Sequence, residues 1–198
     1  MIFGSILADC PWTYGNWTDG KNGAAASAMA TMENEDLAAL PVKQWADPSG
    51  CFLFSWATLP KLQEGLAIPR MWGFEFVTAI PWLKLSRAGE IKSGVGFWAR
   101  QCAELLTVWR LGKPVPVRDR TQTPVGLLVD AESGETVFYA PPGGKHSAKP
   151  LAVHSWIEGL GNGPFLELFA REQREGWTCW GYDLGQEIGS WGVREFKQ

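Results

Sequence analysis

Several short segments of the chain are apolar at nearly every position, and this pattern limits the folds open to it more than any other feature. A strand that is apolar on both sides belongs in the middle of a sheet whose two faces are covered by other elements. The segments therefore predict strands of a covered sheet, at residues 3–8, 51–56, 74–83, 103–109, 136–140, 164–169 and 177–181.

Helical patterns lie between these strands. Residues 33–40 begin with acidic side chains, which suit the amino end of a helix, and residues 61–72 are helical in pattern up to Gly73. Residues 149–160 carry apolar side chains at a spacing of three to four, with Ser147 as a candidate N-cap. Strands that alternate with helices predict an α/β sheet with crossover connections.

The length of the chain, 198 residues, suits one domain with its own core, so we expect a single domain over residues 1–198. Residues 13–30 and 84–100 are rich in glycine and in small or polar side chains, and each directly follows an apolar strand. Open α/β folds bind their ligands at the carboxyl ends of the strands, so we expect mobile substrate loops there. Residues 112–146 are expected to form an insertion.

The composition excludes several classes of protein. No apolar run approaches the roughly 20 residues that a membrane span needs, and the N-terminus has no secretory pattern, so we expect a cytoplasmic protein. The four cysteines lie far apart and there are two histidines. Reduced thiols are therefore favoured over disulfides, and we expect no metal site.

The charges of the chain are unevenly distributed. A formal net charge of −3 argues against a uniformly basic nucleic-acid binder. Residues 84–149, however, hold ten Lys and Arg side chains against six Asp and Glu side chains. A basic stretch on an acidic body is typical of a surface that contacts phosphates, and it fits ordinary solvated loops equally well.

The first apolar strand ends in four residues of a different kind, Asp9, Cys10, Pro11 and Trp12. To be methylated, an amino group on an aromatic base needs an acceptor for its hydrogens, a second acceptor that fixes its lone pair and a surface for its ring. Asp9 supplies the first, the main-chain carbonyl of Cys10 the second and the indole of Trp12 the third, while Pro11 fixes the backbone. We therefore interpret these four residues as a catalytic motif.

Asp9 to Trp12 is similar to the Asp-Pro-Pro-Trp motif of amino-group methyltransferases that use S-adenosylmethionine. The rest of the chain resembles the MT-A family of adenine-N6 methyltransferases, which includes the catalytic subunit of the messenger-RNA adenosine-N6 methyltransferase and bacterial and phage DNA-adenine enzymes. The segments that carry this resemblance occur in the family's order, at residues 30–42, 51–58, 71–84, 94–106, 146–150, 164–171 and 176–184.

The resemblance implies a Rossmann-like class I methyltransferase sheet in a permuted order, with the catalytic strand first. It implies that Lys149 binds the methionine carboxylate of the cofactor and that Arg171 reaches the ribose. The residues that it assigns to S-adenosylmethionine are Asp9, Lys149, Glu167, Phe169, Arg171, Gly181, Tyr182 and Asp183. The chain departs from the family where Cys10 replaces proline and Tyr182 replaces asparagine.

The resemblance further implies methyl transfer to the N6 amine of adenine in nucleic acid, with DNA favoured over RNA. The expected mechanism is direct in-line transfer without a covalent intermediate or a metal, on an adenine flipped out of the duplex. The residues expected to contact the substrate are Trp12, Tyr14, Lys84, Arg87, Lys92, Arg100 and Glu104. The short chain leaves no room for a recognition domain, so we expect relaxed specificity or a second subunit, as would suit a phage enzyme.

Each of these side chains also has an ordinary structural interpretation. Trp12 fits a core position, Glu104 and Arg171 fit ion pairs, and Lys149 fits a solvated helix start. Two other functions also stay open. One is a non-catalytic methyltransferase-like subunit that binds nucleic acid, although such a protein does not need Asp9. The other is cytosine-N4 methylation, which uses the same amine geometry but more often the motif Ser-Pro-Pro-Tyr.

Overall fold

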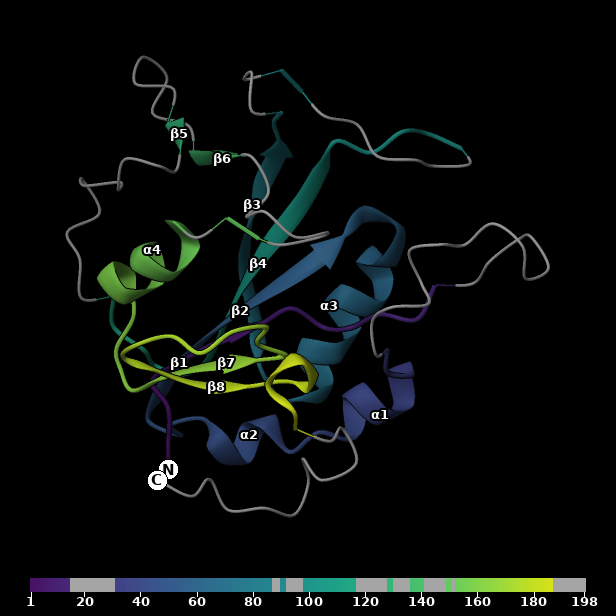
Figure 1. Cartoon of the computed structure of the whole chain (residues 1–198). Coiled ribbons are helices and arrows are strands. Elements are labelled where there is room, and N and C mark those ends of the chain that lie inside the picture. The colour runs from purple at the N-terminus through teal and green to yellow at the C-terminus, as the bar shows by residue number, and fades with distance from the viewer. Residues whose placement is uncertain are drawn as a thin grey trace.

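The computed structural model describes residues 1–14, 31–86, 90–91, 98–116, 149–150 and 152–186, together with the backbone of residues 128–129 and 136–140. Strands and helices alternate along most of this part of the chain (Figure 1). The elements in chain order are β1 Ser5–Ala8, α1 Asn34–Ala39, α2 Val42–Trp45, β2 Gly50–Thr58, η1 Leu59–Lys61, α3 Leu62–Met71, β3 Glu75–Lys84, β4 Ala103–Gly112, β5 Leu128–Val129, β6 Thr136–Ala140, α4 Ala152–Leu160, β7 Phe165–Leu168, β8 Trp177–Trp180 and η2 Tyr182–Leu184.

The strands form one sheet in the order β5-β6-β3-β4-β2-β1-β7-β8. β1 lies in the interior of the sheet, parallel to β2 on one side and to β7 on the other, and β8 continues the parallel arrangement. β4 is antiparallel to both of its neighbours, β2 and β3. As a result, the carboxyl ends of β1, β2, β3, β7 and β8 meet the amino end of β4 at one edge of the sheet, which we call the carboxyl edge.

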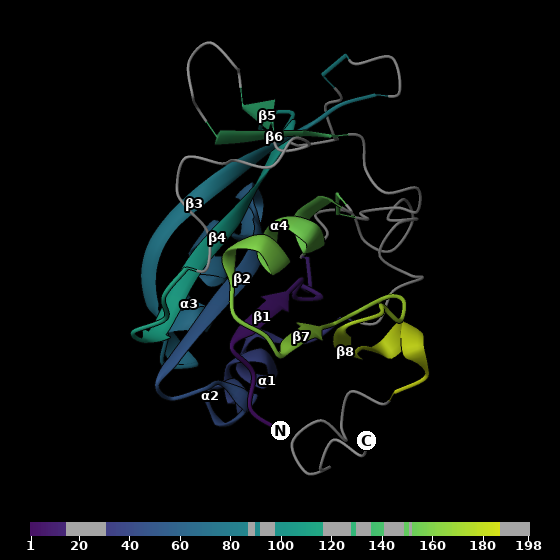
Figure 2. The same cartoon turned by 90° about the vertical axis from the view of Figure 1, so that its left-hand side faces the viewer.

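Helices cover both faces of the sheet, with α3 and α4 on opposite sides of its central strands (Figures 1 and 2). On one face, Ile6 and Ala8 of β1 pack in a cluster with residues of α1, α2 and α3. On the other face, Leu7 packs in a cluster with Val153 and Ile157 of α4. Successive residues of a strand point to opposite faces, which explains the alternation along β1. The sheet is thus buried on both sides.

The α/β fold predicted from the apolar segments is confirmed, and all seven predicted strands are present with their ends shifted by a few residues. The helices α1, α3 and α4 lie within the predicted helical segments, although α4 begins at Ala152. Two short elements, α2 and β5, were not expected, because four and two residues are too few to show a periodic pattern. The permuted order implied by the resemblance stays a prediction.

The predicted crossover connections are present, since α1 and α2 lie in the chain between the parallel neighbours β1 and β2, and α3 lies between β2 and β3. The antiparallel pairing of the adjacent strands β3 and β4 was not predicted. Antiparallel neighbours need no crossover, because the chain returns on the same edge. Most of the predicted loops 13–30 and 84–100 and of the insertion 112–146, as well as Ser147, lies outside the described residues. None of the described helices is long and apolar enough to cross a membrane.

Candidate active site

Asp9 follows the last residue of β1, at the carboxyl edge of the sheet. The alternation along β1 carries the side chain of Asp9 to the same face as Leu7, which is the face covered by α4. Its neighbour Cys10 is turned to the opposite face, where it is buried among the core residues below α1 and α3. The strand therefore presents the carboxylate to the edge and keeps the thiol in the core.

Two cations lie beside Asp9. The Nζ atom of Lys149, which precedes α4, is 2.9 Å from both carboxylate oxygens of Asp9. A guanidinium nitrogen of Arg171, which follows β7, is 3.8 Å from Oδ2 of the same residue. The side chain of Lys149 is 10% exposed and its Nζ lies over the ring of Trp56 at 5.7 Å from the centroid. Asp9 is thus held in a partly buried cationic site.

Glu104 extends this site across the sheet. It is the second residue of β4 and lies opposite Thr58 of β2 and Trp82 of β3. One of its carboxylate oxygens is 3.2 Å from Nζ of Lys149, and the other accepts a hydrogen bond from Nζ of Lys84. Glu104 is 3% exposed, so its charge depends on these two lysines. The four side chains Lys84, Glu104, Lys149 and Asp9 form one connected row, which we call the ion-pair row.

The pKa values of the two most buried members follow from this arrangement. Burial raises the pKa of Glu104, but the nearby Lys149 and the hydrogen bond from Lys84 outweigh it, so that the pKa lies below its usual value. Burial lowers the pKa of Lys149, but the carboxylates of Asp9 and Glu104 outweigh it and hold the pKa above its usual value. Both groups are therefore charged at neutral pH.

The other three residues of the motif are less open than the sequence predicts. The Cys10 carbonyl accepts the N–H of Trp12 at 3.0 Å, and the Pro11 carbonyl accepts the N–H of Met32 at 2.8 Å. A carbonyl oxygen has two lone pairs, so the Cys10 carbonyl retains capacity for a second donor. Trp12 is 5% exposed and packs in the core. The predicted stacking on Trp12 therefore requires that its ring be uncovered, because the apolar indole is buried here.

Tyr14 is the aromatic residue of this segment that lies open. Tyr14 is 45% exposed, and its hydroxyl is 2.9 Å from Oγ1 of Thr58 at the end of β2. Lys61 lies over the ring at 6.0 Å from its centroid. Burial of the hydroxyl raises the pKa of Tyr14 despite the hydrogen bond with Thr58. Tyr14 is thus fixed at its hydroxyl end with part of its ring exposed.

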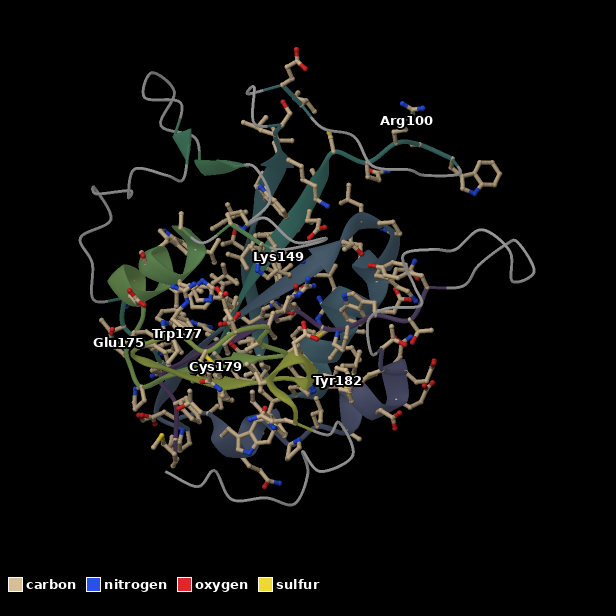
Figure 3. The ribbon with its side chains drawn as sticks, in the orientation of Figure 1. Arg100, Lys149, Glu175, Trp177, Cys179 and Tyr182 are labelled. Carbon is tan, nitrogen blue, oxygen red and sulfur yellow. The ribbon has the colours of Figure 1, made fainter. Side chains whose placement is uncertain are left out.

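The residues that the resemblance assigns to the cofactor are not all gathered around Asp9. Nε2 of His154 lies 2.9 Å from the carboxylate of Glu167, so Glu167 is engaged with α4. Phe169 is 8% exposed and has a φ of 65° where the chain leaves β7. Tyr182 is 56% exposed in η2, which also contains Asp183, and Figure 3 shows Tyr182 apart from Lys149.

Gly181 has a clear steric role at the end of β8. A Cβ atom at this position would lie 2.1 Å from the carbonyl oxygen of Ala170 and 2.6 Å from its nitrogen. The N–H of Gly181 donates to Oε1 of Gln186 at 2.7 Å. Glycine is therefore required for the close approach of β8 to the segment that ends in Arg171.

Apart from the buried Trp12, six residues were predicted to contact the substrate, and the structure places them differently. Lys84 and Glu104 lie in the ion-pair row and Tyr14 lies at the end of β2. Arg100 lies well away from Lys149 (Figure 3). The remaining two, Arg87 and Lys92, lie outside the described residues. The sequence reasoning missed Trp56 and Thr58, although both are near the end of a predicted strand, where ligand-facing side chains gather.

Open α/β folds bind their ligands at the carboxyl ends of the strands, and Asp9, Lys149 and Arg171 lie together at this edge. The family model described as MT-A70 matches residues 3–183, and the chain belongs to this family. The resemblance inferred from the motif segments is thereby confirmed.

Relatives of the chain are methyltransferases. The chain is 27% identical to the type II methyltransferase M.MunI of a Mycoplasma species over 197 residues, which cover 90% of the chain and 76% of M.MunI. It is 22% identical to the mouse N(6)-adenine-specific methyltransferase METTL4 and 25% identical to the human one. Each of these two matches covers 92% of the chain but 37% of METTL4, so the chain spans little more than a third of METTL4.

Proposed function

We propose that the protein transfers a methyl group from S-adenosylmethionine to the N6 amine of adenine in nucleic acid, with DNA as the preferred substrate. Membership of the MT-A70 family and the names of the relatives support the adenine-N6 reaction. The single observation that carries the proposal is the position of Asp9, a carboxylate at the carboxyl edge beside Lys149 and Arg171.

The chemistry of the site fits this reaction. The exocyclic amine of adenine has two hydrogens, and a carboxylate such as Asp9 accepts them and orients the nitrogen lone pair. The carbonyl of Cys10 supplies a second acceptor beside it. The amine need not be deprotonated first, because its lone pair would form the new N–C bond while the bond between the methyl group and the sulfonium breaks, which would leave a neutral thioether. We propose that Asp9 then accepts the proton that the methylated amine must lose.

The charged side chains also fit the proposed cofactor. S-adenosylmethionine, when bound, supplies an electrophilic methyl group on a sulfonium. Lys149 is a buried ammonium and suits the carboxylate of the methionine part, while Arg171 has donors for the ribose hydroxyls. The glycine at position 181 keeps β8 close to the segment that carries Arg171. We assign Lys149 and Arg171 to cofactor binding.

Substrate contacts are proposed on the same edge. Tyr14 exposes part of an aromatic ring on which a base can stack, and aromatic stacking holds unpaired bases. Arg87, Lys92 and Arg100 belong to the segment between β3 and β4 and are proposed to contact phosphates. We further propose action in the cytoplasm, with relaxed specificity or a second subunit that recognises the site.

The test is methyl transfer from labelled S-adenosylmethionine to single-stranded and double-stranded DNA and RNA in parallel. We expect the wild type to label DNA and Asp9→Ala to be inactive, with an unchanged circular dichroism spectrum. Asp36→Ala, which removes an exposed carboxylate of α1, is the matched control and retains activity. Full activity of Asp9→Ala would contradict the proposed role of Asp9.

The same assay distinguishes the proposed function from cytosine-N4 methylation and from a non-catalytic role. Nucleoside analysis of the product distinguishes N6-methyladenine from N4-methylcytosine. A protein that binds nucleic acid but neither binds the cofactor nor transfers methyl groups would be the non-catalytic subunit. The presence of Asp9 with its cationic partners favours the enzyme.

A further inference from the structure

Glu104 is a buried carboxylate for which methyl transfer itself provides no obvious task. It is 3% exposed. It lies near the amino end of β4, and β4 pairs with β2 on one side and with β3 on the other. Its two oxygens are divided between Lys84 and Lys149. Because both of its oxygens contact lysines, we interpret Glu104 as a residue that positions other side chains of the site.

Lys149 has two carboxylate partners, and the proposed reaction requires one of them to release it. It is shared between Glu104 at 3.2 Å and both oxygens of Asp9 at 2.9 Å. For Asp9 to accept the hydrogens of a substrate amine, at least one of its oxygens must give up Lys149. A buried ammonium that loses its carboxylate partner is costly to keep charged. A second carboxylate on Lys149 removes this cost, and Glu104 is that carboxylate.

We propose that Glu104 is a positioning residue that holds Lys149 in the site while Asp9 exchanges Lys149 for the substrate amine. Lys84 fixes the other oxygen of Glu104 from the end of β3. This assignment rests on the proposed function, and it changes the role expected for Glu104 from a substrate contact to a support of the cofactor-binding lysine. Among the residues that the structure describes, the charged groups that contact this lysine or its partners include Asp9, Glu104, Lys84 and Arg171, and Glu104 is the buried carboxylate of this set.

The experiment is a double-mutant cycle on Glu104 and Lys149, read by calorimetric binding of S-adenosylmethionine without nucleic acid. Glu104→Gln keeps the shape of the side chain and removes its charge, and we expect it to weaken binding by about tenfold or more in the wild-type background. In the Lys149→Met background the same change is expected to have little effect, because the residue through which it acts is gone. Glu75→Gln, which removes an exposed carboxylate on β3, is the control and leaves binding unchanged.

A second measurement does not depend on the cofactor or on the folding of Lys149→Met. Carbon-13 chemical shifts of labelled lysine report the titration of Lys149 in the cofactor-free protein. We expect Lys149 to lose its proton at lower pH in Glu104→Gln than in the wild type, and cofactor binding to be lost at correspondingly lower pH. A change that only perturbed packing would leave this titration where it was.

Three results would overturn the assignment. An unchanged Lys149 titration in Glu104→Gln is the first, and additive effects of the two substitutions are the second. The third is a variant with wild-type cofactor binding and a raised KM for nucleic acid, which would restore Glu104 as a substrate contact. If the wild-type protein itself bound no S-adenosylmethionine, the proposed function would fall and this assignment with it.

Discussion

The side chains to which we assign the proposed reaction lie just beyond the ends of strands. Asp9 is directly after β1, and Arg171 follows β7 after two residues. The roles proposed for these two charged residues depend on their neighbours. A carboxylate between a buried ammonium and a guanidinium is held in one place, which is what a hydrogen-bond acceptor for an amine requires.

The stability of the folded protein at acidic pH depends on Glu104. Its pKa is lowered in the folded protein, so it contributes stability above its ordinary pKa and loses that contribution as the pH falls through the lowered value. We expect Glu104→Gln to cost about 3–5 kcal/mol at pH 7, since it removes the buried carboxylate that pairs with both Lys149 and Lys84. The difference in unfolding free energy between the variant and the wild type is expected to become smaller as the pH is lowered, because Glu104 of the wild type is then protonated. Urea unfolding from pH 7 to pH 3 measures this.

Glu75→Gln is the control for that series. The Glu75 side chain is 72% exposed and pairs with an exposed Arg110, and exposed pairs contribute little to stability. We expect its unfolding free energy to follow the wild type at every pH. A loss for Glu104→Gln that stayed constant down to pH 3 would show that its effect is not one of charge.

At the scale of elements, much of the architecture follows from local pattern. The position of Asp9 was predictable, because an apolar run that ends abruptly in an acid marks both a strand and its edge. The ion-pair row was not predictable as a unit. Lys84, Glu104 and Lys149 are far apart in sequence, and their meeting depends on the antiparallel direction of β4. Nothing in the residues of β4 distinguishes an antiparallel strand from a parallel one that is buried on both faces.

Trp12 shows a different limit of sequence reasoning. A tryptophan close to an acid at the end of a strand suits a stacking surface and a core position alike, since both place its ring against flat or apolar neighbours. The structure has it in the core, where the bridge between Trp12 and Met32 joins the motif to the chain that leads into α1. Whether the ring is exposed or buried depends on the residues that pack against it, and these residues are distant in sequence.

The contact between β8 and the end of β7 gives a prediction for Gly181. A methyl group there meets main-chain atoms of Ala170, which have no side-chain freedom to move aside. We expect Gly181→Ala to lower the free energy of unfolding by about 1–3 kcal/mol. Because Arg171 adjoins Ala170, cofactor affinity is expected to fall as well. Thermal unfolding and calorimetry measure the two effects, and unchanged values for both would show that β8 is free to move away.

At the scale of the whole molecule, buried thiols lower the stability of the fold at alkaline pH. Burial raises the pKa of Cys51 to about 12, and burial next to Asp9 raises that of Cys10 also. Above about pH 9 the unfolded chain releases these protons while the folded chain keeps them, so stability falls as the pH rises. The decline amounts to about 1.4 kcal/mol per pH unit for each thiol.

Cys51→Ala tests this account. We expect the variant to be less stable than the wild type at pH 7, because it loses buried volume. Between pH 9 and pH 11, however, its stability is expected to decline less steeply, by about 1.4 kcal/mol per pH unit. Val153→Ala, another truncation of a buried side chain, retains the wild-type slope. Parallel slopes for all three proteins would rule out Cys51 as a source of the alkaline decline.

The pairing of β3 with β4 has a consequence for how such a protein can diversify. The main-chain N–H of Lys84 donates to the carbonyl of Cys102 at 2.8 Å, and the side chain of Lys84 bonds Glu104. The two ends of the intervening segment are therefore fastened together at their base, beside the ion-pair row. A segment held in this way can be lengthened, shortened or replaced without shifting its attachment points. If this segment contacts the nucleic acid as proposed, evolution can alter target recognition without disturbing the ion-pair row.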